Sequence, residues 1–192
     1  RDLRMSRGLG DVYKRQDDDW PKLGEALAAL SDTKIYIDDN SSVTATEIGA
    51  KCRKMKIEKG LDLVIIDYLQ LMSSGMSGVN RQQEVSDISR TLKVMANDLG
   101  IPVIALSQLN RSVEKRDVKE PVLSDLRESG SIEQDADMVI FLYREGYYNE
   151  DCEEPNKTKI KFDKHRNGEV GSEFLSWLGE YTKFANWSGM RE

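Results

Sequence analysis

The stretch from Leu61 to Gly75, LDLVIIDYLQLMSSG, constrains the fold more than any other part of the chain. Its aliphatic run leads into one carboxylate, Asp67, and small residues follow a few positions later. So short and apolar a run is typical of a parallel strand that helices bury on both faces. Asp67 is then expected at the carboxyl end of the strand, the edge where open α/β sheets bind ligands. A carboxylate in that place either holds Mg²⁺ beside a nucleotide, directly or through water, or merely caps a turn.

Composition and charge narrow the class of protein. The chain has 192 residues, of which 39% are hydrophobic and 32% charged, as expected for one globular domain with its own core. A net charge of −6 and a pI near 5.1 mean that any DNA contact must come from a local patch. The two cysteines lack metal-ligand spacing, which argues against a zinc site. Without a long apolar run or a signal-peptide core, we expect a cytoplasmic protein that does not contact membranes.

The first sixteen residues, RDLRMSRGLGDVYKRQ, differ from the rest of the chain. They are basic and show no periodicity, and they resemble the adapter-derived peptides found at the translated ends of assembled environmental sequences. An ordinary disordered tail is the alternative. We therefore interpret residues 1–16 as a non-native or disordered tail and residues 17–192 as the domain.

From residue 19 onward, helical and strand patterns alternate. Apolar spacing and end signals predict one helix after Asp19, a second from the capping box of Thr44 and Glu47 to Gly60, and a third that Gly100 ends. Strands are expected at residues 34–38, 61–67, 102–108, 136–144, 158–168 and 172–184. This order predicts an α/β fold: a mostly parallel sheet flanked by helices on both faces, with antiparallel strands at its C-terminal end.

Polar side chains follow three of the predicted strands. Asp67 ends the first, Gln108 follows the second, and Lys164 and Arg166 end a later one. A carboxylate, an amide and two cations suit a nucleoside triphosphate, because they can bind a metal, sense the γ-phosphate and neutralise charge in the transition state. Taken singly, Gln108 is more often a surface amide and the cation pair a solvated strand end. A shared location of all four residues favours the nucleotide site.

Five segments, LVIIDYLQLM, IPVIALSQLNR, LSDLRESGSIEQDAD, KHRNG and LGEYTKF, occur in an order and at distances that resemble the C-terminal motor domain of the DnaB-type replicative DNA helicases. The segment SDLRESGSIEQDAD is especially specific, because neither composition nor fold requires it. The resemblance covers residues from about 18 to 187. It implies a partial RecA-like P-loop NTPase core that assembles into a homo-hexameric ring around single-stranded DNA. ATP or another NTP would be hydrolysed at the subunit interfaces with the help of Mg²⁺. A primase and a helicase loader are the implied partners, and the nucleoid is the implied location.

The resemblance also assigns roles to the strand-end residues. Asp67 corresponds to the Walker B carboxylate on Mg²⁺, and Gln108 to the residue that senses the γ-phosphate and couples it to DNA. Lys164 and Arg166 are similar to a pair that reaches the γ-phosphate of the neighbouring subunit, as an arginine finger does. At strand positions i and i+2 they share a face, and His165, where many family members have Gln, points away.

The segment LRESG resembles the family's DNA loop. By that resemblance Arg127, Glu128 and Gly130 line the central channel and contact the phosphate backbone. Arg127 can supply a charge-assisted contact, whereas Glu128 can contribute only its backbone, and Gly130 permits close approach of N–H groups to a phosphate. A Ser/Gly turn before a helix is the structural alternative.

Two parts of the family's motor are missing from the sequence. A P-loop requires Gly-Lys-Ser/Thr, and the chain contains no Gly-Lys dipeptide. In the family, the P-loop, the catalytic glutamate and a primase-interacting domain all precede the matching region, so we expect a truncated motor domain that is inactive alone. A RecA-like recombinase or another RecA-fold ATPase would lack LRESGSIEQDAD. If the chain is instead a non-catalytic interaction module derived from the motor, the absence of a P-loop is natural and needs no truncation.

Overall fold

The computed structural model describes residues 19–40, 43–73, 80–149 and 151–189. The chain divides into two compact units, residues 1–39 and residues 40–192. The described part of the first unit contains helix α2 (Asp19–Ser31), and the predicted tail of residues 1–16 lies outside the described residues. Residues 34–40 adopt no regular structure, so the strand predicted at 34–38 is wrong. Its apolar residues favour a strand, but a strand forms only where a neighbour accepts its backbone hydrogen bonds.

Helix α3 (Ala45–Glu58) begins where the capping box predicts. The Thr44 hydroxyl accepts a hydrogen bond from the Glu47 N–H at 3.2 Å, and the Glu47 carboxylate accepts one from the Thr44 N–H at 2.8 Å. The second of these bonds also lowers the pKa of Glu47, because it stabilises the charged carboxylate. The two bonds satisfy backbone donors that would otherwise lack partners at the start of the helix.

Helix α4 (Arg81–Leu99) has the predicted C-terminal end. Its N-cap is Asn80, whose side chain accepts a hydrogen bond from the N–H of Gln82 at 3.2 Å. It ends at Gly100, whose φ of 59° lies in the left-handed region that favours glycine. The two caps therefore fix where α4 begins and ends, and with this the position of its apolar stripe against the core.

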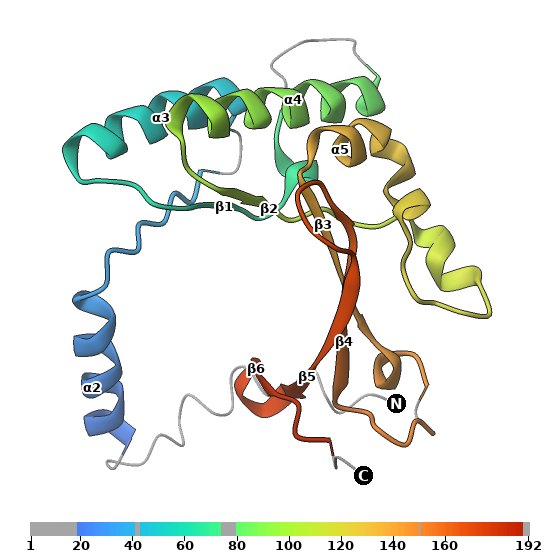
Figure 1. Cartoon of the computed structure of the whole chain (residues 1–192). Coiled ribbons are helices and arrows are strands. Elements are labelled where there is room, and N and C mark those ends of the chain that lie inside the picture. Colours follow the sequence, from blue (N-terminus) through green and yellow to red (C-terminus); the bar gives the residue numbers. More distant parts are fainter. Residues whose placement is uncertain (1–18, 41–42, 74–79, 150, 190–192) are drawn as a thin grey trace. The chain divides into compact units, whose positions relative to one another are not determined.

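Strands β1 (Val64–Ile66) and β2 (Val103–Ala105) pair in parallel, and α3 and α4 cover one face of the pair (Figure 1). Between these layers lies the larger core. Its buried members are Ala45, Ile66, Leu69, Met72, Val85, Ile88, Leu92, Met95, Leu99, Ile101 and Ile132. Burying this apolar surface is what holds the two helices on the sheet.

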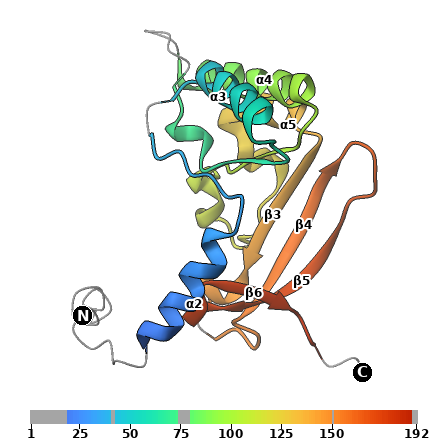
Figure 2. The same cartoon turned by 90° about the vertical axis from the view of Figure 1, so that its left-hand side faces the viewer.

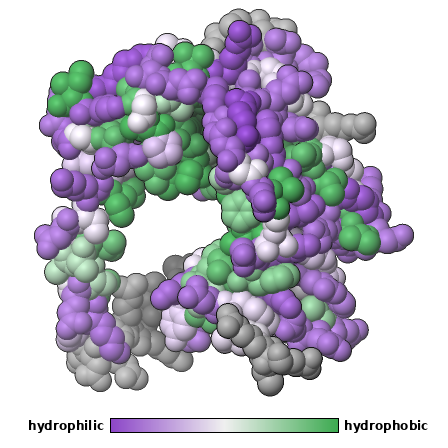
Figure 3. Space-filling model, in the orientation of Figure 1, coloured by the Kyte–Doolittle hydropathy of each residue, from purple (hydrophilic) through white to green (hydrophobic). Residues whose placement is uncertain are grey.

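Within the unit of residues 40–192, the described residues leave the other face of β1 and β2 uncovered. Ile65 is 63% exposed and Ile104 is 49% exposed. Figure 3 shows hydrophobic side chains gathered on the side of these strands that faces away from α3 and α4. Within this unit helices pack on one face of the pair, so the predicted burial on both faces is not met there.

The remaining strands form an antiparallel sheet in the order β3-β4-β5-β6 (Figure 2). They are β3 (Met138–Arg144), β4 (Lys157–His165), β5 (Gly171–Leu178) and β6 (Lys183–Asn186). Among the strands of the described residues, only β1 and β2 pair in parallel, an isolated parallel bridge between Thr44 and Ser73 lies outside the strands, and every pairing within the second sheet is antiparallel. The predicted order, parallel pairing followed by antiparallel strands at the C-terminal end, is confirmed. The sheet was expected to be mostly parallel, however, whereas the described strands form two sheets and the parallel one is a single pair.

Short helices connect these layers. A 3₁₀ helix, η5 (Leu123–Ser129), runs directly into α5 (Gly130–Asp135), which precedes β3. A second, smaller core of Leu126, Val139 and Phe141 lies under this region. The other 3₁₀ helices are η3 (Leu69–Leu71), η4 (Arg111–Lys115), η6 (Glu145–Tyr147) and η7 (Gly179–Tyr181). In the described ranges, no helix has both the length and the apolar character needed to cross a membrane.

Candidate functional site

Asp67 and Gln108 follow neighbouring parallel strands. Asp67 comes directly after β1, and Gln108 follows β2 after Leu106 and Ser107. Backbone bonds extend the pairing beyond the strands, because the Leu106 N–H donates to the Ile66 carbonyl at 2.9 Å. The carboxyl ends of these strands therefore meet at one edge, as predicted for this pair.

A further amide, Gln70, joins the two strand ends. Its Nε2 donates to the Ser107 hydroxyl at 3.0 Å, and its Oε1 accepts from the Gln108 N–H at 3.2 Å. One side chain thus fixes the segment after β2 to the segment after β1. Sequence reasoning missed Gln70, although it lies in the same run as Asp67, because an isolated amide gives no signal of its partner.

The side chains of Asp67 and Gln108 are exposed, and neither takes part in a hydrogen bond or ion pair within the described ranges. A single open carboxylate suits Mg²⁺, which usually takes one or two carboxylates and completes its shell with phosphate oxygens and water. No three His, Cys, Asp or Glu residues cluster as a metal site in the part of the chain that the structure describes. Asp67 thus fits a metal that is shared with a phosphate.

A pocket of about 320 Å³ lies between Gln108 and the N-terminal end of α4. Its polar wall includes Gln70, Asn80, Arg81 and Gln108. Arg81 is fixed there, since it donates to the Gln70 carbonyl at 2.7 Å and to the Met72 carbonyl at 3.2 Å. Of the predicted site residues whose side chains the structure describes, only Gln108 lines this pocket.

Lys164 and Arg166 lie at the end of β4, against the last turn of α5. Lys164 Nζ donates to the carbonyls of Glu133 and, at 3.3 Å, Gln134, and Arg166 Nη2 donates to the Gln134 carbonyl at 3.0 Å. Both side chains reach the same carbonyl, as expected for residues on one strand face. Cations are favoured here because the carbonyls at a helix C-terminus carry partial negative charge.

Asp137 holds Arg166 from the other side. Its Oδ1 lies 3.1 Å from Arg166 Nη1, and its other carboxylate oxygen bonds Lys93. The hydrogen bond from Lys93, with the nearby charges of Lys93, Arg166 and Lys164, lowers the pKa of Asp137 below its usual value. Sequence reasoning missed Asp137, although the specific segment SDLRESGSIEQDAD contains it.

The two predicted pairs do not share one location. Asp67 and Gln108 follow the parallel sheet, whereas Lys164 lies in the antiparallel sheet and Arg166 follows it. Because β4 runs antiparallel to β3, its end returns to the start of β3, where His165 pairs with Met138. No hydrogen bond or ion pair joins the two pairs among the described residues. The expectation that all four strand ends meet is therefore not borne out.

The predicted DNA segment is helical, not a loop. The side chains of Arg127 and Glu128 lie outside the described residues, but the backbone of η5 and α5 passes through LRESG. Gly130 has φ −53° and ψ −21°, which any residue adopts, and a Cβ there would meet no atom within 4 Å. The fold of this chain therefore does not itself require glycine at position 130.

A sequence profile of the DnaB-like helicase C terminal domain matches residues 9–186, a range that contains every predicted site residue. This chain belongs to that family. It is 56% identical over 174 residues to the replicative DNA helicase DnaB of Geobacillus stearothermophilus, covering 90% of this chain and 38% of that protein. It is 55% identical over 171 residues to the replicative DNA helicase DnaC of Bacillus subtilis (strain 168), covering 88% of this chain and 38% of that protein.

Solved structures of DnaB-like proteins have the same fold. One of them, an ATPase domain, matches with a TM-score of 0.89 and 42% identity, covering 93% of this chain and 64% of that chain. A DnaB-like replicative helicase, solved to show its interactions with primase, matches with a TM-score of 0.87 and 41% identity, covering 97% of this chain and 44% of that chain. The predicted ATPase-type fold is confirmed, and membership of the DnaB-like family decides against the recombinase alternative.

Proposed function

We propose that this chain is part of the motor of a homo-hexameric replicative DNA helicase, which couples NTP hydrolysis to movement on single-stranded DNA and to unwinding. The observation that carries the proposal is the joined pair of strand ends, from which Asp67 and Gln108 extend with open side chains. The chain spans 38% of its Geobacillus relative. We call the longer protein of this proposal the parent helicase.

In the parent helicase, Asp67 would hold Mg²⁺, directly or through water, and the metal would offset negative charge on the phosphates of ATP or another NTP. Gln108 would donate a hydrogen bond to the γ-phosphate or to the attacking water. Because Gln70 holds the Gln108 backbone, any shift of Gln108 would be transmitted to both strand ends. This tie gives the sensor a rigid base.

The phosphate cradle would come from residues outside this sequence. The apolar face of β1 and β2 suits the packing of such residues, because an exposed patch of this kind usually marks a contact surface. The ATPase domain among the matched structures is longer, since this chain covers 64% of it. A primase, a helicase loader and a place at the nucleoid belong to the same proposal, and another of the matched structures describes interactions with primase.

Lys164 and Arg166 would act on the nucleotide of the neighbouring subunit. Their separation from Asp67 and Gln108 supports this, because a pair on another sheet is poorly placed for its own subunit's phosphates. In a ring, a residue far from its own site can complete the next one. The cations would then neutralise charge that develops on the γ-phosphate in the transition state.

Arg127, Glu128 and Gly130 would contact single-stranded DNA at the ring's centre. The open space around Gly130 supports this role, because the fold leaves room there for an outside group to approach the backbone. Arg127 would bind a phosphate through its charge. Glu128 would contribute its backbone N–H only, since its carboxylate repels phosphate.

The test is a salt titration of the parent helicase on two labelled oligonucleotides of unrelated sequence. Arg127→Ala should weaken binding about equally for both and reduce the salt dependence by roughly one phosphate contact. Hydrolysis without DNA should persist while its stimulation by DNA falls. Lys183→Ala, which removes an exposed cation from β6, serves as the control. Unchanged affinity and slope in Arg127→Ala would remove this segment from the DNA channel.

A further inference from the structure

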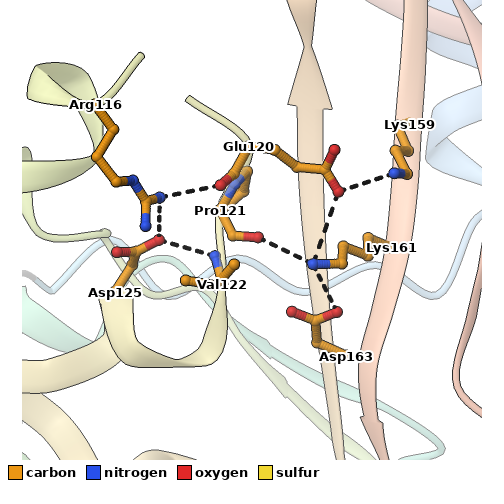
Figure 4. Close-up of polar contacts among 8 residues, drawn as sticks. All are labelled: Arg116, Glu120, Pro121, Val122, Asp125, Lys159, Lys161 and Asp163. Carbon is orange, nitrogen blue, oxygen red and sulfur yellow. Dashed lines mark hydrogen bonds and ion pairs between the residues drawn. The ribbon is translucent and has the colours of Figure 1, made fainter. Parts of the chain in front are cut away.

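The first turn of η5 is held by a buried carboxylate, Asp125, which is 5% exposed. Its Oδ2 accepts hydrogen bonds from Arg116 Nη2 at 2.7 Å and from the Val122 N–H at 2.8 Å (Figure 4). The Asp125 N–H in turn donates to the Val122 carbonyl at 2.8 Å. The carboxylate therefore fixes both the start of η5 and the chain that enters it.

Arg116 binds both the Glu120 carbonyl and the Asp125 carboxylate, and so holds the segment from residue 116 to residue 125 together. Its Nη2 also donates to the Glu120 carbonyl at 3.0 Å, while its Nε is buried and has no partner among the described residues. A single nitrogen thus joins residue 116, the Glu120 carbonyl and Asp125. Removing Arg116 would leave the buried Asp125 carboxylate without its ion-pair partner, which is costly in a low-dielectric setting, whereas the Arg116 side chain is 37% exposed.

The same segment is tied to strand β4. The Glu120 carboxylate lies 2.8 Å from Lys159 Nζ and 3.7 Å from Lys161 Nζ, and Lys161 also donates to the Pro121 carbonyl at 3.4 Å (Figure 4). Asp163 holds Lys161 in place at 2.9 Å. We call these contacts of Arg116, Glu120 and Asp125 the clamp. Because Lys164 and Arg166 lie at the end of β4, the clamp connects the proposed DNA segment to the strand of the proposed trans-acting pair.

We propose that Arg116 and Asp125 are positioning residues for the proposed DNA contact, with Glu120 as their tie to β4. The inference rests on the proposed role of Arg127, which lies two positions after Asp125. A backbone that is already fixed loses less conformational entropy when it meets a phosphate, so the clamp should raise DNA affinity without touching DNA. Neither residue is assigned a contact with nucleotide or DNA.

The first experiment measures hydrogen exchange in the 192-residue chain. Asp125→Asn keeps the shape of the side chain but removes its charge, and it should speed exchange of the amides from Val122 to Gly130 by about tenfold or more. The amides of β5 should keep their rates, since the bonds of the clamp drawn in Figure 4 reach β4 and not β5. Unchanged exchange from Val122 to Gly130 would overturn the proposal.

The second experiment measures DNA binding by the parent helicase. Asp125→Asn should raise the Kd for single-stranded DNA about tenfold while leaving the slope against salt unchanged, because no phosphate contact is lost. Glu120→Gln should raise it less. Arg127→Ala is the matched comparison, because it should change the slope.

The outcomes separate the two proposals. If Arg127→Ala weakens binding but Asp125→Asn does not, the positioning role fails and the DNA role of LRESG stands. If Arg127→Ala has no effect, the DNA role fails, and the exchange result still decides whether the clamp holds η5. A reduced salt slope in Asp125→Asn would also overturn the positioning role. If Asp125→Asn does not fold, Arg116→Lys, which keeps the charge but loses the planar fork, is judged by the same readouts.

Discussion

The two pairs of proposed catalytic residues are held in opposite ways. The strand-end pair, Asp67 and Gln108, has a braced backbone and open side chains within the described ranges. The cation pair, Lys164 and Arg166, is held by its side chains against α5, and Asp137 adds an ion pair to Arg166. We interpret this difference as follows: Asp67 and Gln108 bind the nucleotide of their own subunit, whereas Lys164 and Arg166 bind the nucleotide of the neighbouring subunit.

The comparison has a physical basis. A cation bound to helix carbonyls can exchange them for phosphate oxygens, because phosphate offers full negative charges in place of partial ones. The open carboxylate of Asp67, by contrast, has no bond within the described residues that it would have to give up before it binds a metal. The cation pair can therefore be stable in a subunit alone and still act across an interface.

The largest expected effect comes from removing the trans-acting cation. In the parent helicase, Arg166→Ala should lower hydrolysis by about 10³, because an arginine finger stabilises charge in the transition state. Mixing this variant with Asp67→Ala subunits should restore part of the activity, since some interfaces then combine an intact metal site with an intact finger. The measurement is steady-state hydrolysis as a function of mixing ratio. No recovery at any ratio would place Arg166 in its own subunit's site and break the comparison.

A second prediction concerns the strand-end pair in the 192-residue chain alone. Without a phosphate cradle, Asp67 and Gln108 offer too few contacts, so we expect MgATP to bind with a Kd weaker than about 1 mM. Calorimetric titration measures this directly. Micromolar binding would contradict the interpretation of the chain as a truncated motor. Weak binding here, with tight binding by the parent helicase, would also disfavour a non-catalytic interaction module.

The smallest effect is on pH dependence near Asp137. Its pKa is lowered from the usual 3.8, mainly by the hydrogen bond from Lys93, so its contribution to stability is present above that value and is lost as pH falls through the lower folded pKa. The contribution should be small, since the side chain is 54% exposed. An NMR titration of the Asp137 carboxyl should show the lowered pKa, and Lys93→Met should bring it back toward 3.8. An unchanged midpoint in Lys93→Met would show that Lys93 is not its cause.

The sequence by itself determined the features that depend on near neighbours along the chain. The capping box of Thr44 and Glu47, the stripe of α4 and its end at Gly100 were all predicted correctly. These features rest on bonds between residues a few positions apart and on the left-handed backbone of one glycine. Five of the six predicted strands also overlap strands of the structure, because alternation and apolar runs are local patterns.

Only the tertiary structure decided which strand ends meet and which side chains are held. Residues 34–38 have the composition of a strand but form none, because pairing requires a neighbouring strand that their own sequence does not specify. The antiparallel return of β4 separates Arg166 from Asp67, and the partners Gln70, Asp137 and Arg116 follow from contacts between distant segments. Such contacts depend on how layers pack in space, so the type and spacing of residues indicate the chemistry of a site but not its arrangement.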